Sequence, residues 1–402
     1  MTVTIPDDLA EASGGKIVLV VMDGLGGLPD PSTGKTELET AAKPNLDRIA
    51  ADAALGLHQP VAPGVTPGSG PGHLALFGYD PLRWNIGRGV LSGLGVGFDL
   101  REGDLATRLN FATVDSEGRV TDRRAGRPSD EENKRLVAKL REKVKPPAGA
   151  ELFFESEKEH RAVMVLRGKG LRAELADTDP QETGVAPLAV KALVPEANAS
   201  AELMQHVLDG GREALRDEPT ANALLARGFA TYERYPTMQE RFKLECLALA
   251  KYPMYRGVAR LVGMDARHTP ASDEQAVELL ERNFNDYDFH FIHFKAVDSR
   301  GEDGDFAAKV KAIEACDPLI GRIEALKPDV LIVTGDHSTP SRLRAHSWHP
   351  VPVLIRSPWV RPNSGQTFGE RPCMQGELGV FSTAHLMALA LAHANRLGKF
   401  GA

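Results

Sequence analysis

Continuous apolar runs mark four places along the chain, and polar residues bound each of them. They lie at residues 16–24 (KIVLVVMDG), 287–298 (YDFHFIHFKAVD), 329–337 (DVLIVTGDH) and 350–355 (PVPVLI). Runs of this length are typical of strands that are buried on both faces. Helical patterns separate them at residues 37–50, where Pro44 interrupts the helix, and at residues 305–326. Strands that alternate with helices predict an α/β fold with a mostly parallel sheet.

The middle of the chain has a different pattern. Residues 105–115 and 161–168 alternate between apolar and polar positions, whereas residues 130–144 and 199–215 have helical patterns. Alternation is typical of strands with one exposed face. We therefore expect a smaller α+β domain at residues 106–230. It would interrupt a core domain built from residues 1–105 and 231–402.

Composition and charge exclude several classes of function. The formal net charge of the 402 residues is −7, whereas nucleic-acid-binding proteins usually carry a basic surplus. The three cysteines are widely spaced and predict neither a disulfide framework nor a cysteine zinc site. No apolar stretch has the length of a signal or membrane-spanning segment. We expect a cytoplasmic protein with neither a nucleic-acid partner nor a membrane partner.

Acids and histidines follow three of the buried runs. Asp23 ends the first run, Asp298 ends the second, Asp336 and His337 end the third, and His346 comes soon afterwards. An open α/β sheet places its ligand site beyond the carboxyl ends of its strands. Several carboxylates at one edge repel one another unless cations are present, and mixed oxygen and nitrogen ligands suit divalent metals. This pattern predicts a site for divalent metal ions.

Ser69 lies in the sequence TPGSGPGHLALFGYD, residues 66–80, directly before an apolar run with helical character. A serine at this position commonly caps the helix. The same place offers backbone N–H groups and the positive end of the helix dipole, which suit a serine that carries a phosphoryl group. Metal ions nearby would lower the pKa of its hydroxyl and neutralise charge on a phosphoryl group.

Several motifs together resemble one known family. They include VMDGLGGLPD, APGVTPGSGPGHLALFGYDP, GRGVLSGLGVGFDL, DRRAGR, TGDHSTP and HSWHPVPVLI, in order between about residues 15 and 390. The chain resembles the archaeal-type cofactor-independent phosphoglycerate mutases of the alkaline phosphatase superfamily. The resemblance implies a three-layer α/β core with an inserted lid domain. It also implies the interconversion of 3-phosphoglycerate and 2-phosphoglycerate through a phosphoserine, without 2,3-bisphosphoglycerate.

The resemblance also implies roles for individual residues. Ser69 would be the nucleophile, and two divalent metals would be bound, manganese first, with zinc, cobalt and magnesium as alternatives. One metal would be held by Asp23, Ser69, Asp336 and His337, and the other by Asp298, Glu302 and His346. The family commonly has histidine where this chain has Glu302, and Asp-Thr-Ala where it has residues 70–72, Gly-Pro-Gly. We expect Glu302 to replace the histidine as a ligand, and its anionic oxygen would favour manganese or magnesium over zinc.

The phosphate and carboxylate of the substrate need cationic partners. The matching motifs supply as candidates Arg88, Arg124, Arg127, His160, Arg161, Arg227 and Lys295. Proton transfer to and from the glycerate hydroxyls needs an acid or base, for which the candidates are His160, Asp122, Asp177 and Asp179.

Two other functions compete with the mutase. A metal-dependent phosphohydrolase, or another phosphotransferase of the same superfamily, would use the same metals and serine but admit water. A catalytically inactive relative would bind metal or a phosphorylated metabolite without turnover. The sequence leaves the oligomeric state open.

Overall fold

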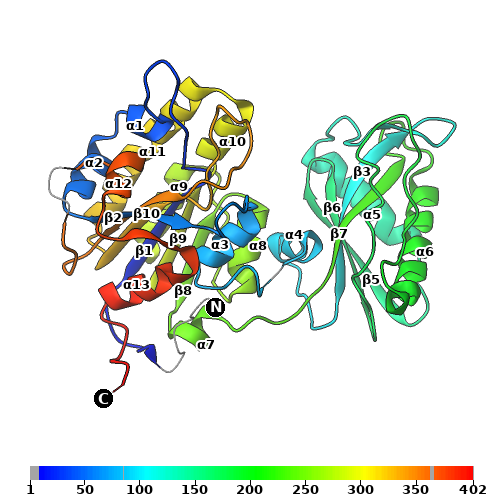
Figure 1. Ribbon diagram of the computed structural model, residues 1–402. Helices are drawn as coiled ribbons and strands as arrows, with labels where there is room; N and C mark the ends of the chain where they lie inside the picture. The colour runs from blue at the N-terminus through cyan, green and yellow to red at the C-terminus, as the bar shows by residue number, and fades with distance from the viewer. Residues whose placement is uncertain (1–8, 85, 363–365, 402) are drawn as a thin grey trace. The chain divides into compact units, whose positions relative to one another are not determined.

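A computed structural model describes residues 9–84, 86–362 and 366–401, and it divides the chain into two compact units (Figure 1). Unit 1 comprises Met1–Asn85 and Pro236–Ala402, and unit 2 comprises Ile86–Tyr235. The predicted insertion, residues 106–230, begins too late. Helix α4, Arg88–Val96, belongs to unit 2 because it packs against strands of that unit. Arg88 therefore lies in unit 2 and not in the core domain to which the sequence assigned it.

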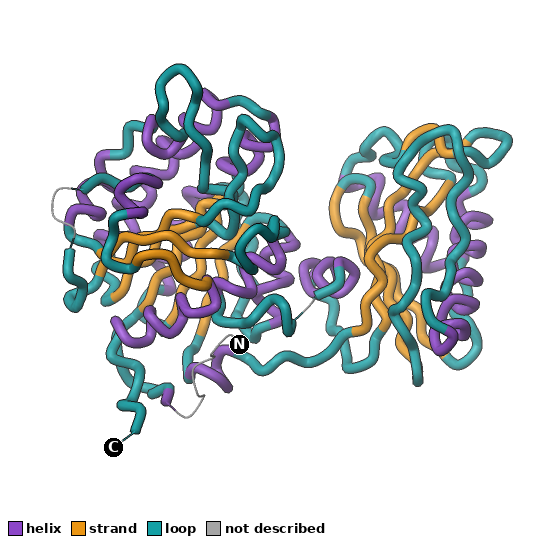
Figure 2. The backbone as a smooth tube through the Cα atoms, viewed as in Figure 1, coloured by secondary structure: helices purple, strands orange, loops and turns teal. Residues whose placement is uncertain are grey.

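Unit 1 contains a sheet of seven strands in the order β12-β2-β11-β10-β1-β9-β8. Figure 2 shows the strands in orange and the helices in purple. Strand β1 is parallel to both of its neighbours, β9 and β10, whereas β11 is antiparallel to β10 and β2. The prediction of an α/β fold with a mostly parallel sheet is confirmed. The strands are β1 Ile17–Met22, β2 Ala54–Gln59, β8 Cys246–Ala250, β9 Phe289–Phe294, β10 Val330–Thr334, β11 Val351–Arg356 and β12 Gly379–Ser382.

Helices cover both faces of this sheet. Apolar side chains of α2, α9 and α11 pack with Val18, Val20 and Met22 on one face. On the other face, Phe77 and His73 of the α3 region contact Phe291 of β9. The helices of unit 1 are α1 Glu37–Thr40, α2 Pro44–Ala51, α3 Ser69–Leu76, α7 Met238–Phe242, α8 Pro253–Leu261, α9 Asp273–Asn283, α10 Ala296–Asp303, α11 Phe306–Ala325, α12 Glu370–Met374 and α13 Leu386–His393, with a 3-10 turn at Thr383–His385.

The break predicted at Pro44 is present. Helix α1 begins at a capping box formed by Thr36 and Glu39, and Pro44 opens α2, where its missing N–H is no loss.

Unit 2 is built on an antiparallel sheet in the order β4-β3-β6-β5, and its fifth strand, β7, also pairs with β3. Its strands are β3 Leu105–Val114, β4 Val120–Asp122, β5 Ala150–Lys158, β6 Arg161–Gly168 and β7 Ala223–Thr231. Helices α5, Asp130–Lys143, and α6, Asn198–Leu215, cover one face, and a 3-10 turn at Pro195–Ala197 precedes α6. Alternate residues of β3, among them Leu109 and Phe111, point into that core.

The other face of this sheet is covered only in part, by α4. A Cβ on Gly89 would come within 2.2 Å of the Ala106 carbonyl oxygen, so only glycine permits this close approach of α4 to β3. On this face β3 carries the polar residues Arg108 and Asn110, and then Ala112 and Val114, which pack in a small apolar cluster with Val120, Ala223 and Leu225.

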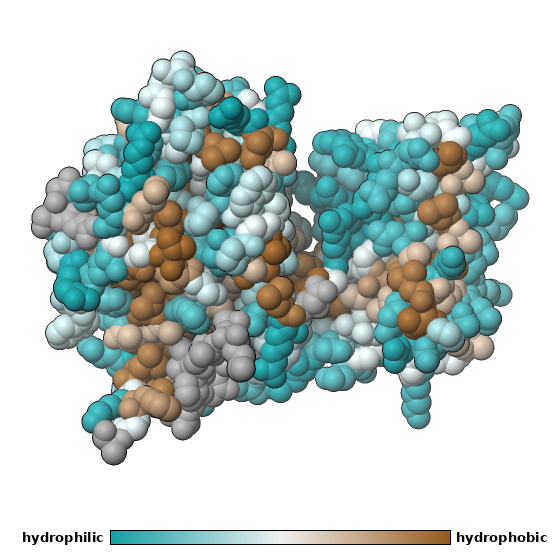
Figure 3. All heavy atoms as spheres, in the orientation of Figure 1, coloured by the Kyte–Doolittle hydropathy of each residue, from teal (hydrophilic) through white to brown (hydrophobic). Residues whose placement is uncertain are grey.

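Hydrophilic and hydrophobic side chains are interspersed over the face of each unit seen in Figure 3. Within the described residues, no helix combines the length and the apolar character that crossing a membrane requires.

Candidate active site

The carboxyl ends of β1 and β10 bring acids together in unit 1. Asp23 follows β1, and Asp336 and His337 follow β10, which is parallel to β1, so all three residues lie at the same edge of the sheet. All three side chains are fully buried, and the Gly24 N–H donates to Asp336 Oδ1 over 3.2 Å. The structure thus brings these residues together as the sequence predicts.

The geometry of Asp23, Asp336 and His337 fits a metal ion. His337 Nε2 lies 3.4 Å from Asp23 Oδ1 and 3.3 Å from Asp336 Oδ2. Neither of these buried carboxylate oxygens has a hydrogen-bond partner among the described residues, although buried polar atoms are normally satisfied. Burial and the charge of Asp23 oppose ionisation of Asp336, but His337 and His73 hold its pKa below its usual value. A divalent cation among these ligand atoms would satisfy both oxygens.

Ser69 is placed to react at this cluster and does not cap its helix. Gly68 is the N-cap residue of α3, and no side chain caps that helix. Ser69 Oγ instead lies 3.2 Å from His337 Nε2. A Cβ on Gly72 would come within 2.5 Å of the Asp336 carbonyl oxygen, so this glycine allows α3 to lie against the loop after β10. The unusual Gly-Pro-Gly sequence after Ser69 thus has a structural reason at its last position.

A second group of potential ligands comprises Asp298, His337 and His346. His346 Nε2 lies 3.6 Å from Asp298 Oδ1, and the rings of His337 and His346 stack with centroids 3.6 Å apart. Thr339 Oγ1 donates to Asp298 Oδ1 over 2.6 Å and fixes the carboxylate. Asp298 lies on α10, beyond the strand where the sequence placed it.

Glu302 lies one turn after Asp298 on α10, and its Oε1 is 3.7 Å from His346 Nε2. Its side chain is 54% exposed, and it is not part of either compact group of ligand atoms among the described residues. Atoms 3.7 Å apart can both ligate one metal ion, so this distance allows His346 and Glu302 to share a site. Ligation by Glu302 stays a prediction.

Two buried histidines lie beside the carboxylates, and sequence reasoning missed both. His293 Nε2 lies 2.9 Å from Asp23 Oδ2, whereas His73 Nδ1 donates to the Ser69 carbonyl oxygen over 2.8 Å and lies 3.2 Å from Asp336 Oδ2. The ring of Tyr255 stacks on His293 with centroids 3.7 Å apart. The spacing of four residues between Ser69 and His73 was an available signal, since it places both on one face of a helix.

Two lysines have distinct places at this edge. Lys295 Nζ lies 3.3 Å from Asp23 Oδ2 and also contacts Asp298. These carboxylates raise the pKa of Lys295 although burial opposes it, so the ammonium charge persists. Lys309 is fully buried on α11, and its Nζ donates to the carbonyl oxygens of Gly24, Gly26 and Thr339 at 2.8–3.0 Å. Lys309 thereby joins the loops that carry Asp23 and His337.

In unit 2, four arginines gather on the sheet face beside α4. Arg108 lies opposite Arg227 across the β3–β7 pair, and Asn110 lies opposite Arg161 across the β3–β6 pair. Arg88, Arg161 and Arg227 together depress the pKa of Arg108, on which burial is the largest effect. Like charges placed opposite each other destabilise a sheet, so this group calls for an anion. Arg108 is the member that the sequence did not single out.

The other candidates of unit 2 have varied surroundings. Burial and the charges of Arg161, Arg124 and Arg127 lower the pKa of His160 to about 4, although Glu159 opposes this. Asp122 accepts hydrogen bonds from the N–H groups of residues 124 and 126. Asp177 accepts from the Gly228 N–H, and Asp179 pairs with Arg123 and Arg227. These carboxylates hold the local backbone and arginines, and their acid or base role stays a prediction.

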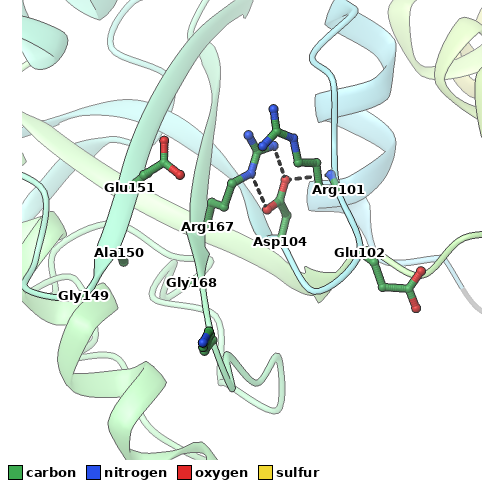
Figure 4. A pocket seen from close by; sticks show the side chains of 9 residues that line it. Arg101, Glu102, Asp104, Gly149, Ala150, Glu151, Arg167 and Gly168 are labelled. Atoms are coloured by element: carbon green, nitrogen blue, oxygen red, sulfur yellow. Dashed lines mark hydrogen bonds and ion pairs between the residues drawn. The ribbon is translucent and has the colours of Figure 1, made fainter.

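A separate surface hollow of about 720 Å³ lies at the end of β3 and β6 remote from Asn110 (Figure 4). Arg167 there forms two hydrogen bonds to the carboxylate of Asp104, at 2.9 and 2.7 Å, and this carboxylate also accepts from the Arg101 N–H. The Asp104 carboxylate in this hollow is thus already paired, and we assign no catalytic role to the hollow.

The chain is similar in sequence to known proteins along most of its length. Residues 50–221 match the family model described as 2,3-bisphosphoglycerate-independent phosphoglycerate mutase. The chain is 50% identical over 398 residues to a probable enzyme of that name from Thermus thermophilus, covering 98% of each protein. It is 48% identical over 404 residues to one from Aquifex aeolicus, covering 98% of this chain and 99% of that protein.

Solved structures are similar as well. A protein of Pyrococcus horikoshii shares 31% identity with a TM-score of 0.82, covering 97% of this chain and 100% of that one. A cofactor-independent phosphoglycerate mutase from Thermoplasma acidophilum shares 27% identity with a TM-score of 0.72, covering 94% of this chain and 100% of that one.

Proposed function

Because the chain belongs to the 2,3-bisphosphoglycerate-independent phosphoglycerate mutase family, a family of isomerases, we propose that it interconverts 3-phosphoglycerate and 2-phosphoglycerate through a phosphoserine at Ser69. The observation that carries this proposal is the position of Ser69. Its hydroxyl lies 3.2 Å from His337 Nε2, beside buried carboxylate oxygens that lack partners among the described residues.

The residues at the sheet edge would hold two divalent metals. One metal would be bound by Asp23, Ser69, Asp336 and His337, and the other by Asp298, His346 and Glu302. Bound there, the metals would lower the pKa of the serine hydroxyl and neutralise charge on the phosphoryl group. We propose manganese as the preferred metal, since anionic oxygens predominate among these ligands. No 2,3-bisphosphoglycerate is needed, because the serine itself carries the phosphoryl group.

The reaction divides into two transfers at Ser69. In the first, Ser69 Oγ loses its proton and bonds to phosphorus as the bond between phosphorus and O3 of the glycerate breaks, and O3 gains a proton. In the second, O2 of the same glycerate loses its proton and bonds to phosphorus as the bond between phosphorus and Ser69 Oγ breaks, and Oγ regains a proton. The Lys295 ammonium lies beside the carboxylates of Asp23 and Asp298 and supplies positive charge where the phosphoryl oxygens would lie.

Unit 2 would hold the acid end of the substrate. Arg88, Arg108, Arg161 and Arg227 form a cationic face on its sheet, and guanidinium groups pair well with carboxylates. Retention of glycerate between the two transfers distinguishes a mutase from a hydrolase. We propose that this unit acts as the lid that retains it, in a cytoplasmic enzyme.

The test is to incubate the manganese-loaded protein with 3-phosphoglycerate and to measure 2-phosphoglycerate and free phosphate in the same sample. We expect 2-phosphoglycerate to form without accumulation of free phosphate. Release of phosphate without 2-phosphoglycerate would identify a phosphohydrolase. Absence of both products with every divalent metal would identify an inactive relative.

A further inference from the structure

Unit 2 has buried polar atoms without partners, and they gather in one region. Among its described residues, the buried atoms without a hydrogen-bond partner belong to five side chains, Arg108, Asn110, Glu157, His160 and Arg227, although Arg227 Nε has an ion-pair partner, Asp177 Oδ2, at 3.5 Å. Strand pairing places Arg108, Asn110 and Arg227 beside one another on the sheet face, and His160 adjoins Arg161 at the turn between β5 and β6. Since buried polar atoms are normally satisfied, their concentration in one place points to a ligand.

A β-bulge brings Glu157 to this region. Ser156 pairs with Ala162 and Lys158 pairs with Arg161, so Glu157 is the extra residue between two regular pairs. A bulge redirects a side chain, and bulges are common beside functional sites. The carboxyl group of Glu157 is close to Arg108 and Arg161 and accepts a hydrogen bond from the Ser92 side chain on α4. Its Oε2 is shielded from solvent and lacks a partner among the described residues.

The unpartnered atoms include both donors and acceptors. Arg108 Nε and Arg227 Nε can only donate, whereas Asn110 Oδ1 can only accept, and so can Glu157 Oε2 when it is ionised. An anion without hydroxyl groups, such as a simple carboxylate, would satisfy the donors alone. A hydroxylated carboxylate would satisfy both kinds of atom, because its carboxylate accepts and its hydroxyl groups donate.

We propose that Asn110 and Glu157 accept hydrogen bonds from substrate hydroxyls, so that unit 2 selects a small hydroxy acid over an anion without hydroxyls. This inference rests on the proposed function, in which the ligand is the glycerate left after Ser69 has taken the phosphoryl group. Glu157 is then a specificity-determining residue. Its negative charge also keeps a second anion away from Arg108 and Arg161, whereas it favours hydroxyl groups there.

The test compares ligands by calorimetry on the full-length manganese-loaded protein. The probes are D-glycerate, which has two hydroxyls, propionate, which has none, and inorganic phosphate. We expect wild-type protein to bind D-glycerate at least about tenfold more tightly than propionate, because hydrogen bonds to charged groups contribute that much. Glu157→Gln should lower this ratio about tenfold and strengthen phosphate binding. Ser92→Ala, which only frees the carboxyl group, should lower the ratio less.

Glu155→Gln is the matched control, since Glu155 lies on the same strand and pairs with Arg141. It should leave the ratio unchanged. Thermal unfolding of each variant shows whether it is folded, and Ser92→Ala tests the proposal if Glu157→Gln is not. An unchanged ratio in folded Glu157→Gln, or a wild-type protein that does not distinguish D-glycerate from propionate, would overturn this inference. Both results are independent of turnover, so they are distinguishable from failure of the mutase assay.

Discussion

The two units collect charged side chains in opposite ways. At the sheet edge of unit 1, carboxylates and imidazoles follow parallel strands, and Asp23, Asp298 and Asp336 are all buried there. On the sheet face of unit 2, arginines lie across antiparallel strands, with Glu157 as the acid beside Arg108. The first arrangement is complementary to cations and the second to anions. In the proposed function, unit 1 would hold the phosphoryl group with its metals, and unit 2 would hold the acid end of the substrate.

The largest effect should come from the nucleophile of unit 1. Ser69→Ala should lower mutase turnover by on the order of 10⁴-fold or more, because both proposed transfers pass through its hydroxyl. The measurement is formation of 2-phosphoglycerate from 3-phosphoglycerate. Ser357→Ala is the control, since Ser357 bonds His393 outside the site and should have wild-type turnover. Substantial turnover in Ser69→Ala would refute the phosphoserine.

The second largest effect should be on manganese affinity, which we expect to depend on unit 1 and not on unit 2. Asp336→Asn removes a charged ligand and should lower manganese affinity about 100-fold, whereas Asp179→Asn in unit 2 removes another buried carboxylate without any effect on manganese. Bound manganese is measured after equilibrium dialysis at several free concentrations. Equal loss of metal in both variants would contradict the assignment of the metals to unit 1.

The KM for the substrate should depend on the arginines of unit 2, which should not affect manganese binding. Arg108→Met should raise KM for 3-phosphoglycerate about 10- to 100-fold, because it removes a cation that would pair with the carboxylate of the substrate. The manganese content of the protein should not change. Arg167→Met on the same sheet is the control, because Arg167 is paired with Asp104 at the remote end. A KM that rises equally in both variants would show that the effect is general damage to the sheet.

A smaller effect is expected at Glu302 of unit 1, because its side chain is half-exposed whereas the other proposed ligands are more deeply buried. Glu302→Gln should weaken one of two manganese sites about tenfold and lower turnover, whereas Glu302→His should keep activity and shift preference toward zinc or cobalt. Titration with each metal, followed by metal content, gives the result. Full activity and unchanged metal content in Glu302→Gln would show that the carboxylate is not a ligand.

Sequence patterns predict the metal edge of unit 1 better than the arginine face of unit 2. Asp23 and Asp336 end apolar runs at the carboxyl ends of strands. The carboxyl ends of parallel strands lie at the same edge of the sheet, independent of the conformation of the loops that follow. Arg108 has no such signal, because a polar residue in an alternating strand is expected on any exposed face. Glu157 reaches the site only through a bulge, which a regular alternation does not predict.

The buried histidines and the unit boundary show a second limit. His293 lies within the apolar run of β9, where the pattern predicts only a strand core, although its ring bonds Asp23. Helix α4 has an ordinary apolar pattern, and only its packing against the strands of unit 2 shows that it belongs to that unit. Such contacts between distant segments depend on tertiary packing, which local pattern does not encode.

Mass spectrometry of the reacting enzyme tests the central claim most directly. The manganese-loaded protein is mixed with 3-phosphoglycerate, quenched in acid during turnover and digested, and the peptide that contains Ser69 is analysed. We predict phosphate on Ser69 during turnover and none in a sample given D-glycerate alone. Formation of 2-phosphoglycerate while Ser69 stays unmodified at every quench time would contradict the account.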